Sequence, residues 1–375
     1  MNITHINSYF ITSPLHAELV SKLDEKGIHQ VVFVPVQQAK DIGVNNPPNL
    51  KYSTLLYDHC FNTTDRFIWP LKIIKTWRSF KKQHKTNPPS IIHAHTLIVN
   101  GLIAFLANKK WGIPYIVTIR ETDVYYFLKK SYIFRKIGER ILKAAAAIIV
   151  LSQAYQNIHL PAILNKKLLN LINIKVSVIP NGINSFWIEN RQRKKTSDEK
   201  PSILFLGQII KRKNLKNLIL AFELLKRNYN SITLTVIGDG PLLAQIRNQT
   251  HSPGVRFLGH IKDRTQILEL FRSSDILVVP SFRETFGLVY PEAMSQGLPV
   301  IYTKDQGFDG FFEDGQVGFA VNPHSPRDIA EKILRIFDDY ERISNNAYEA
   351  SKEFNWDEIA DKLLKIYSKT LNHKQ

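Results

Sequence analysis

The stretch Asp275–Val300, DILVVPSFRETFGLVYPEAMSQGLPV, contains a strand, a loop and a helix start that together define the predicted fold. Within it, Ile276–Val279 is a short apolar run ended by Pro280, which is typical of a buried parallel strand. A loop follows, and a helix is predicted over Tyr290–Gln296, ending at Gly297. In an open parallel sheet, the end of a strand and the start of the next helix form the usual ligand site, where unpaired backbone N–H groups attract phosphate. The stretch therefore predicts an α/β fold with an anion site.

Two carboxylates, Glu284 and Glu292, lie on either side of that loop. Glu284 comes shortly before Gly287, where the backbone can approach a ligand closely, and Glu292 falls in the first turn of the predicted helix. Considered alone, Glu284 is a solvated loop acid and Glu292 complements the helix dipole. A ligand-binding role for the pair depends on the whole string around them: Glu-Thr-Phe-Gly-Leu, Pro-Glu-Ala-Met and Gly-Leu-Pro-Val.

Length and composition indicate a soluble or peripheral globular protein of two domains. The chain has 375 residues, of which 44% are hydrophobic and 22% charged. Its net charge of +17 indicates an anionic partner: nucleic acid, a membrane surface or a phosphorylated substrate. The single cysteine, Cys60, excludes disulfides within the chain and cysteine-based zinc sites, and it suits the cytoplasm. We expect no signal peptide at MNITHINSYF, and the longest apolar run, Ala144–Leu151, is too short to cross a bilayer.

Strand and helix patterns alternate along the chain in two series, which predicts two doubly wound, Rossmann-like domains with a cleft between them. The first series has strands at Ile3–Ile11, Val31–Val36, Ile91–His95, Pro114–Ile119, Ala146–Leu151 and Val176–Ile179. The second has strands at Ile203–Leu206, Thr233–Ile237, Val255–Leu258, Ile276–Val279, Val300–Tyr302 and Gly318–Val321. Helices are predicted at Pro14–Lys26, Ile68–Lys85, Gly101–Asn108, Ile133–Lys143 and Trp356–Leu371, and residues 37–65 carry no clear pattern.

The polar stretch Glu189–Lys200 has no periodicity and is interpreted as a linker or exposed edge. We therefore expect an N-terminal domain over residues 1–185 and a C-terminal domain over 186–355. The helical end, about 356–375, is expected to pack back on the first domain.

A glycine followed by cations begins the second domain. Gly207 ends a strand, and Lys211, Arg212 and Lys213 precede the next helix, which makes an anion-binding corner. Taken alone, Lys211 and Arg212 would form a solvated basic turn. The later Gly238-Asp239-Gly240-Pro241 is, by itself, a tight turn after a strand. The chain has no Gly-x-Gly-x-x-Gly and no phosphate-loop lysine motif, which argues against dehydrogenases and P-loop NTPases.

His93 and His95 form a His-x-His at a strand end in the first domain. They resemble metal ligands, but no acid or cysteine supports them nearby in the sequence. Hydrogen-bonded strand-end residues are therefore the favoured interpretation. No pair of acids suited to a divalent metal stands beside the second-domain motifs, so we expect no metal ligand and no cofactor.

The string around Glu284 and Glu292 closely resembles the signature of retaining group 1 glycosyltransferases (sequence family 4), which have the GT-B fold. The resemblance covers most of residues 90–370. It implies a nucleotide-diphosphate sugar as donor and retention at the anomeric carbon. Glu284 would then hold sugar hydroxyls and Glu292 the ribose hydroxyls, while Phe286, Gly287 and Leu288 would offer backbone N–H groups to the diphosphate. The class is thought to need no side-chain base, because the leaving phosphate accepts the acceptor's proton.

The same resemblance assigns roles to other residues. Lys213 would neutralise the leaving group and Arg120 would assist it. The donor would also contact Gly207, Gln208, Gly238, Gly240, Leu258 and His260, and the acceptor side would include His95 and Asp123. Several positions depart from the family pattern: Gln208 stands where an arginine is usual, and Asn214 and Glu121 each replace a glycine. Arg120 takes a place that is often histidine, and the loop Ser8–Leu15 lacks the usual Gly-Gly. A neutral amide at position 208 stabilises a leaving diphosphate less than a guanidinium does.

The segment 66–85 predicts a second partner. It lies in a run without any Asp or Glu, from Arg66 to Arg120, and it combines Trp69 and Trp77 with seven lysine and arginine side chains, so it is suited to docking on anionic lipid. The alternative is a core-facing helix with a solvated basic edge. Docking would indicate a lipid-linked saccharide acceptor at the cytoplasmic face, as in bacterial surface-polysaccharide synthesis.

Two other classes of function stay open at the level of sequence. One is a GT-B relative that is not a transferase, such as an epimerase-like protein, or one that is inactive. The other is a basic nucleic-acid-binding protein, although the chain carries no recognised nucleic-acid motif and no nucleic acid is expected.

Overall fold

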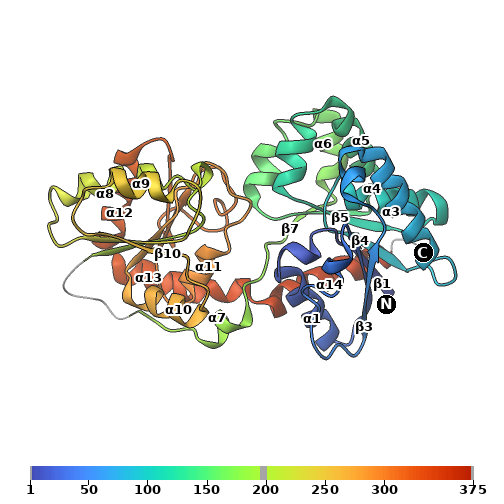
Figure 1. Cartoon of the computed structure of the whole chain (residues 1–375), viewed down its shortest axis with the longest axis horizontal. Coiled ribbons are helices and arrows are strands. Elements are labelled where there is room, and N and C mark those ends of the chain that lie inside the picture. Colours follow the sequence, from blue (N-terminus) through green and yellow to red (C-terminus); the bar gives the residue numbers. More distant parts are fainter. Residues whose placement is uncertain (1, 195–200, 373–375) are drawn as a thin grey trace. The chain divides into compact units, whose positions relative to one another are not determined.

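The computed structural model describes residues 2–194 and 201–372, without the side chains of residues 66 and 67. The chain forms two compact units. The first comprises Met1–Leu151, Tyr155–Gly182 and Trp356–Gln375, and the second comprises Ser152–Ala154 and Ile183–Asn355. Each unit contains one parallel sheet (Figure 1). This is the two-domain α/β architecture that the alternating pattern predicts.

The first unit holds a seven-stranded sheet in the order β3-β2-β1-β4-β5-β6-β7. Its strands are β1 (Asn2–Ile6), β2 (His29–Val36), β3 (Ser53–His59), β4 (Ile91–Ala94), β5 (Tyr115–Ile119), β6 (Ala147–Val150) and β7 (Val176–Val178). Its helices are α1 (Leu15–Glu25), α2 (Thr63–Phe67), α3 (Trp69–Gln83), α4 (Val99–Trp111), α5 (Tyr132–Ala144), α6 (Lys166–Asn173) and α14 (Trp356–Asn372). Shorter helical turns are η1 (Phe10–Thr12), η2 (Ala39–Asp41), η3 (Asp123–Leu128) and η4 (Tyr155–His159).

The second unit holds a six-stranded sheet in the order β10-β9-β8-β11-β12-β13. Its strands are β8 (Ser202–Leu206), β9 (Thr233–Ile237), β10 (Val255–Gly259), β11 (Ile276–Val278), β12 (Val300–Thr303) and β13 (Gly318–Val321). Its helices and helical turns are α7 (Ser185–Glu189), η5 (Lys211–Lys213), α8 (Leu215–Lys226), α9 (Leu243–Gln249), α10 (Arg264–Ser273), α11 (Val289–Met294), α12 (Pro326–Asp338), α13 (Tyr340–Ala350) and η6 (Ser351–Phe354).

Each sheet has one point where the strand order reverses. It lies between β1 and β4 in the first sheet and between β8 and β11 in the second. At such a point the two following loops turn to opposite faces and leave a crevice at the carboxyl ends of the strands. The residues that follow β1, β4, β8 and β11 are therefore the ones that the fold exposes to a ligand.

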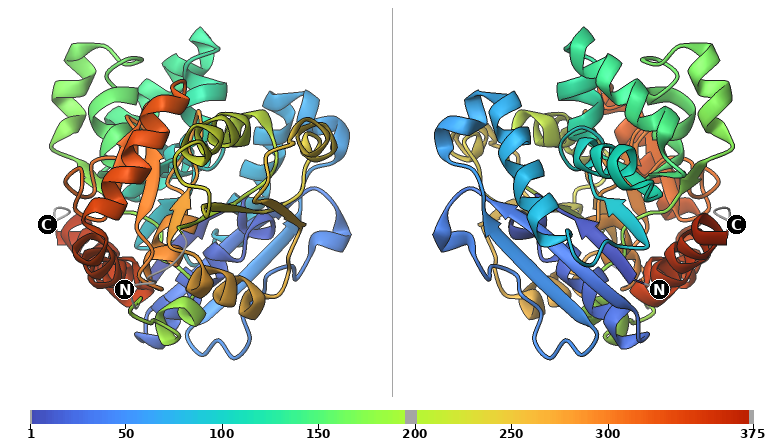
Figure 2. Two further views of the ribbon diagram at one scale, coloured as in Figure 1. Left: turned by 90° about the vertical axis from the view of Figure 1, so that its left-hand side faces the viewer. Right: turned by 90° about the vertical axis from the view of Figure 1, so that its right-hand side faces the viewer.

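The helix α14 belongs to the first unit although it follows the whole second unit in sequence (Figure 2). Its apolar side, which includes Ile359, Leu363 and Tyr367, shares one core cluster with Ile3 of β1 and Leu19 of α1. The indole N–H of Trp356 donates to the Glu18 carboxylate at 2.8 Å. Apolar burial and this hydrogen bond hold the helix on the unit where the chain began.

Three expectations from the sequence need correction. The first strand ends at Ile6, not Ile11, because Asn7 begins a turn in which its side chain accepts from the backbone N–H of Tyr9 at 3.0 Å. Residues 37–65 contain the edge strand β3 and most of α2. β3 has one neighbour and a half-exposed surface, so it lacks the apolar run of a buried strand. The predicted linker Glu189–Lys200 overlaps the end of α7, and residues 195–200 lie outside the described residues.

Candidate functional site

A cavity of about 550 Å³ opens at the carboxyl ends of β8 and β9 in the second unit. Five of the residues predicted to bind the donor line it: Gly207, Gln208, Gly238, Gly240 and His260. Leu258 does not line it, and its side chain is exposed on β10. The strand order therefore brings together three separate loops whose proximity the sequence alone does not show.

Glycine is required at two positions in the wall of this cavity. A Cβ on Gly238, which has a φ of +143°, would lie 1.9 Å from the carbonyl oxygen of Gly207. A Cβ on Gly240, with a φ of +158°, would lie 2.5 Å from the carbonyl oxygen of Ile209. Both distances are far below van der Waals contact, so the turn can pack against the β8 loop only without side chains.

Lys213, in the turn η5 after β8, forms an ion pair with Glu284, in the loop after β11. The Lys213 Nζ is 2.5 Å from the Glu284 Oε2, and their side chains are only 13% and 10% exposed. The Ser281 hydroxyl donates to the same oxygen at 3.4 Å, and the backbone N–H of Glu284 donates to Gln306 Oε1 at 3.2 Å. Partial burial strengthens such a charge-assisted contact, because little water competes for either group.

This ion pair borders the cavity on one side and the α11 loop on the other. A Cβ on Gly207, which lines the cavity, would lie 3.8 Å from the Lys213 stem. A Cβ on Gly287, which has a φ of +87°, would lie 2.4 Å from the Tyr290 ring and 3.2 Å from Glu284 Cγ. The structure thus places the predicted lysine and glutamate, 71 residues apart, in one site with two of the predicted glycines.

Asn214 shows why one departure from the family pattern is tolerated. It has a left-handed backbone, with φ +58°, which asparagine adopts more readily than most residues. Its buried amide donates to the carbonyl of Pro280 at 2.9 Å and to that of Pro323 at 2.7 Å. The side chain therefore ties the start of α8 to the loops that follow β11 and β13, and a glycine could not make these bonds.

The other predicted residues around α11 take different positions. Phe286 is buried among Phe308, Phe311 and Phe354, so its side chain is part of the core. Leu288 precedes α11, and Glu292 lies on its first turn, half-buried.

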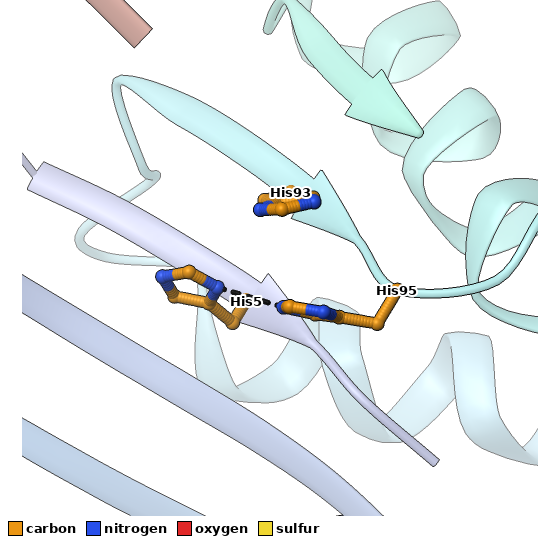
Figure 3. A group of neighbouring side chains, drawn as sticks. All are labelled: His5, His93 and His95. Carbon is orange, nitrogen blue, oxygen red and sulfur yellow. Dashed lines mark hydrogen bonds between the residues drawn. The ribbon is translucent and has the colours of Figure 1, made fainter. Parts of the chain in front are cut away.

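Three histidines meet at the switch point of the first sheet (Figure 3). His5 on β1 is opposite His93 on β4 in the strand register, and His95 follows β4. His5 Nδ1 is 2.9 Å from His95 Nε2, and the rings of His93 and His95 stack with centroids 4.2 Å apart. His93 also bonds to the hydroxyls of Tyr367 at 2.7 Å and Thr118 at 2.8 Å. Sequence reasoning missed His5, because only the strand order places it beside His93.

These histidines are neutral at physiological pH. Burial lowers the pKa of His5 to about 4, and it holds the pKa values of His93, His95 and the neighbouring His16 well below the usual 6.5. Neutral imidazoles are the form that binds metals, and one nitrogen of each of the three lies within 4.8 Å of the others. However, His5 Nδ1 and His95 Nε2 bond to each other, both nitrogens of His93 bond to hydroxyls, and the nearby Arg120 charge disfavours a further cation.

Arg120 and Asp123 organise the loops that follow β4 and β5. The Asp123 carboxylate accepts from the backbone N–H groups of Leu97, Ile98 and Arg120 at 2.9, 3.1 and 3.0 Å. Arg120 Nε donates to the carbonyl of His95 at 2.9 Å. Burial raises the pKa of Asp123 to about 6 and lowers that of Arg120 to about 10, so Arg120 keeps its charge at neutral pH. Asp123 therefore fixes the backbone of two loops through hydrogen bonds. The sequence predicted only a place for it on the acceptor side.

Two family descriptions match the chain, one for each unit. "Glycosyltransferase Family 4" matches residues 17–185, and "Glycosyl transferases group 1" matches residues 188–354. The chain belongs to this glycosyltransferase family, and its two Rossmann-like units constitute the GT-B fold. The resemblance seen in the sequence is thereby confirmed.

Individual relatives agree with this assignment. An uncharacterised glycosyltransferase from Methanocaldococcus jannaschii is 26% identical over 94% of this chain and 93% of its own length. The alpha-monoglucosyldiacylglycerol synthase of Acholeplasma laidlawii is 27% identical over 70% of this chain and 71% of its own. The structure of the Anabaena protein HepE, solved in complex with UDP, matches 98% of this chain and 100% of its own with a TM-score of 0.70 and 21% identity. Among the described residues, no helix is both long and apolar enough to span a membrane.

Proposed function

We propose that this glycosyltransferase moves a hexosyl or N-acetylhexosaminyl group from a nucleotide-diphosphate sugar, UDP- or GDP-linked, to a saccharide, with retention at the anomeric carbon. The observation that supports the donor class most directly is the Lys213–Glu284 pair at the edge of the glycine-walled cavity. A half-buried cation beside a cavity of this volume suits an anionic ligand. The structural neighbour HepE, which was solved with UDP, supports the same class of donor.

In the proposed reaction the bond from the anomeric carbon to the diphosphate oxygen breaks. The acceptor oxygen then bonds to the same face of that carbon. The acceptor's proton goes to the leaving phosphate, so no side-chain base is needed. Lys213 stabilises the negative charge that develops on the diphosphate, Glu284 holds sugar hydroxyls, and Glu292 holds the ribose. Arg120 supplies further positive charge in the first unit, where His95 and Asp123 shape the acceptor side.

The chemistry as proposed uses side-chain cations in place of a metal, so we propose that the transfer needs none. The test is donor turnover in EDTA. Turnover that disappears on chelation and returns with Mg²⁺ or Mn²⁺ would contradict this part of the proposal.

Donor binding tests the core of the proposal. Wild type and Glu292→Ala are compared by calorimetry against UDP, GDP and ADP and their common sugar derivatives. We expect saturable binding of one diphosphate, weakened in Glu292→Ala. If wild type binds none of them, the chain is an inactive relative and the proposed function fails. A salt-dependent gel shift without nucleotide binding would favour the nucleic-acid alternative, and epimerised donor sugar without transfer would favour the epimerase-like one.

We also propose that the acceptor is a lipid-linked saccharide of bacterial surface polysaccharide (lipopolysaccharide O-antigen, capsule or exopolysaccharide), reached by a peripheral enzyme on the cytoplasmic face of the plasma membrane. The support is an exposed apolar surface on the first unit. On α3 and the residue before it, Ile68, Leu71 and Ile74 are 55%, 36% and 45% exposed, on the side opposite buried Ile73 and Phe80. The Lys and Arg side chains of the same helix suit anionic headgroups.

A second helix extends this surface. Tyr132 and Ile133 at the start of α5 are 69% and 70% exposed. The helices α3 and α5 are in contact through the rings of Trp69 and Phe134, whose centroids are 4.8 Å apart. One charge is already compensated, because Lys75 Nζ pairs with the buried Asp65 carboxylate at 2.7 Å. The segment predicted from the sequence, 66–85, is therefore one part of a larger surface.

Vesicle sedimentation tests this surface. We expect wild type to bind phosphatidylglycerol vesicles and not phosphatidylcholine ones. Leu71→Ser with Ile133→Ser should weaken binding about tenfold, because two exposed apolar side chains that would enter the bilayer are lost. Leu220→Ser is the matched control, since Leu220 is 40% exposed on the second unit. Binding that Leu71→Ser with Ile133→Ser leaves unchanged, or equal binding to both lipids, would refute docking here.

A further inference from the structure

The turn η5 places two cations against a single carboxylate. Lys213 Nζ lies 2.5 Å from Glu284 Oε2, and Arg212 Nη1 lies 3.8 Å from Glu284 Oε1. The Lys213 stem lies along Gly207 in the wall of the cavity, so this cluster stands at the edge of the cavity. In a partly buried setting such cations attract an anion, because the dielectric screening there is weaker than in bulk water.

Arg212 is held in place before any ligand arrives. Its carbonyl accepts from the backbone N–H of Phe282 at 2.8 Å, and its Nη1 donates to the carbonyl of Arg283 at 3.1 Å. Both its backbone and its guanidinium are thus fixed to the loop that leads to Glu284. A guanidinium has five N–H donors in a fixed plane, and 28% of this side chain stays accessible to a ligand. Such a group is preorganised for a phosphate.

The position matters because no lysine or arginine within the described part of the chain lines the cavity, whereas the acidic Asp239 does. Gln208 lines the cavity with a neutral amide, and the stem of Lys213 lies along Gly207. The positive charge on this side of the cavity therefore comes from η5 and not from the loop after β8.

We propose that Arg212 binds the diphosphate of the donor together with Lys213 and supplies the guanidinium that position 208 lacks. Glu284 holds both cations in place until the donor binds. This assignment rests on the proposed function, and it makes Arg212 a binding residue that the sequence had placed in a solvated basic turn.

Calorimetry with UDP, GDP and ADP, and with the nucleoside of whichever base binds, tests the assignment. We expect Arg212→Gln to raise the Kd of the diphosphate about tenfold or more, as for loss of a charged hydrogen bond, and to change the Kd of the nucleoside less than about twofold. Arg212→Lys should recover part of the loss, because a point charge replaces the planar fork only partly. Lys211→Gln is the matched control, since this exposed residue carries the same charge on the same turn.

The double variant Gln208→Arg with Arg212→Gln gives the sharpest result. If the two positions serve one diphosphate, an arginine at 208 should restore most of the affinity that Arg212→Gln removes. Diphosphate binding unchanged in Arg212→Gln would overturn the assignment. So would an equal loss for nucleoside and diphosphate, which indicates a structural role, or an equal loss in Lys211→Gln. Wild type that binds no nucleoside diphosphate would instead refute the proposed function, so the two failures are distinguishable.

Discussion

The two sheets carry polar side chains at equivalent places, but these side chains are charged in one sheet and neutral in the other. At the switch point of the second sheet, Lys213 and Arg212 are charged and half-buried beside the buried carboxylate of Glu284. At the switch point of the first, His5, His93 and His95 are fully buried and neutral, and they bond to one another and to hydroxyls. A charged cluster can respond to an anionic ligand, whereas a neutral hydrogen-bonded network fixes the ends of the strands. We therefore expect the charged cluster of the second unit to take part in ligand binding and the histidine network of the first to fix its strand ends.

Removing a charge from the second unit should have the largest effect. We expect Lys213→Ala to lower turnover by about 10²–10³-fold, because the leaving diphosphate loses its closest cation. Turnover is followed as release of nucleoside diphosphate from the donor sugar that wild type binds. Lys211→Ala is the control on the same turn. If both variants lose activity equally, the Lys213–Glu284 ion pair has no special role in turnover, and the charged cluster of the second unit does not act as proposed.

The second largest effect should come from lowering the pH, which should reduce the free energy of unfolding of the first unit. The folded histidines have pKa values below the unfolded value of 6.5, so their stabilisation is complete above pH 6.5 and is lost as the pH falls toward about 4, the folded pKa of His5. At pH 5, His5 alone should cost about 2 kcal/mol of unfolding free energy. Asp123, with a pKa raised to about 6, acts in the opposite direction and offsets about 1 kcal/mol.

Urea unfolding at pH 7 and pH 5 measures this effect through tryptophan fluorescence, since Trp69, Trp77, Trp111 and Trp356 belong to the first unit and only Trp187 to the second. His5→Gln should be less stable than wild type at pH 7 but lose less stability on acidification. Stability that is equal at the two pH values would show that the network is not neutral.

The smallest effect on nucleotide binding is expected at Asn214. Asn214→Gly keeps the left-handed backbone but removes two hydrogen bonds, to Pro280 and Pro323, and should cost about 1–2 kcal/mol of stability. Nucleotide affinity should stay within about twofold of wild type, because the amide points to the β11 loop and not into the cavity. Thermal unfolding and calorimetry measure the two quantities. A large loss of affinity would mean that asparagine here contributes to binding directly.

Local patterns in the sequence predicted most of the strands and the motifs of the second unit. The run Ile276–Val279 and the glycines at 238 and 240 depend on nearby residues only, so their patterns are visible without the fold. The family resemblance assigned both Glu284 and Lys213 to the donor site, but it did not predict that they form an ion pair. The contacts of Arg212 and His5 depend on strand order and on loops that are far apart in sequence, which no local pattern encodes. The edge strand β3 was missed because half-exposed strands have a weaker apolar signature.

The hydrogen bond between His93 and Tyr367 joins residues separated by 274 positions, with the whole second unit between them in the chain. During synthesis the ribosome makes β1 to β7 long before it makes α14. The second unit is contiguous from 183 to 355 and can therefore complete its fold first. The first unit cannot complete its core until α14 has been synthesised. Until then, the apolar surface that Ile359, Leu363 and Tyr367 later cover stays exposed. The earliest-made half of this enzyme is thus the last to be finished.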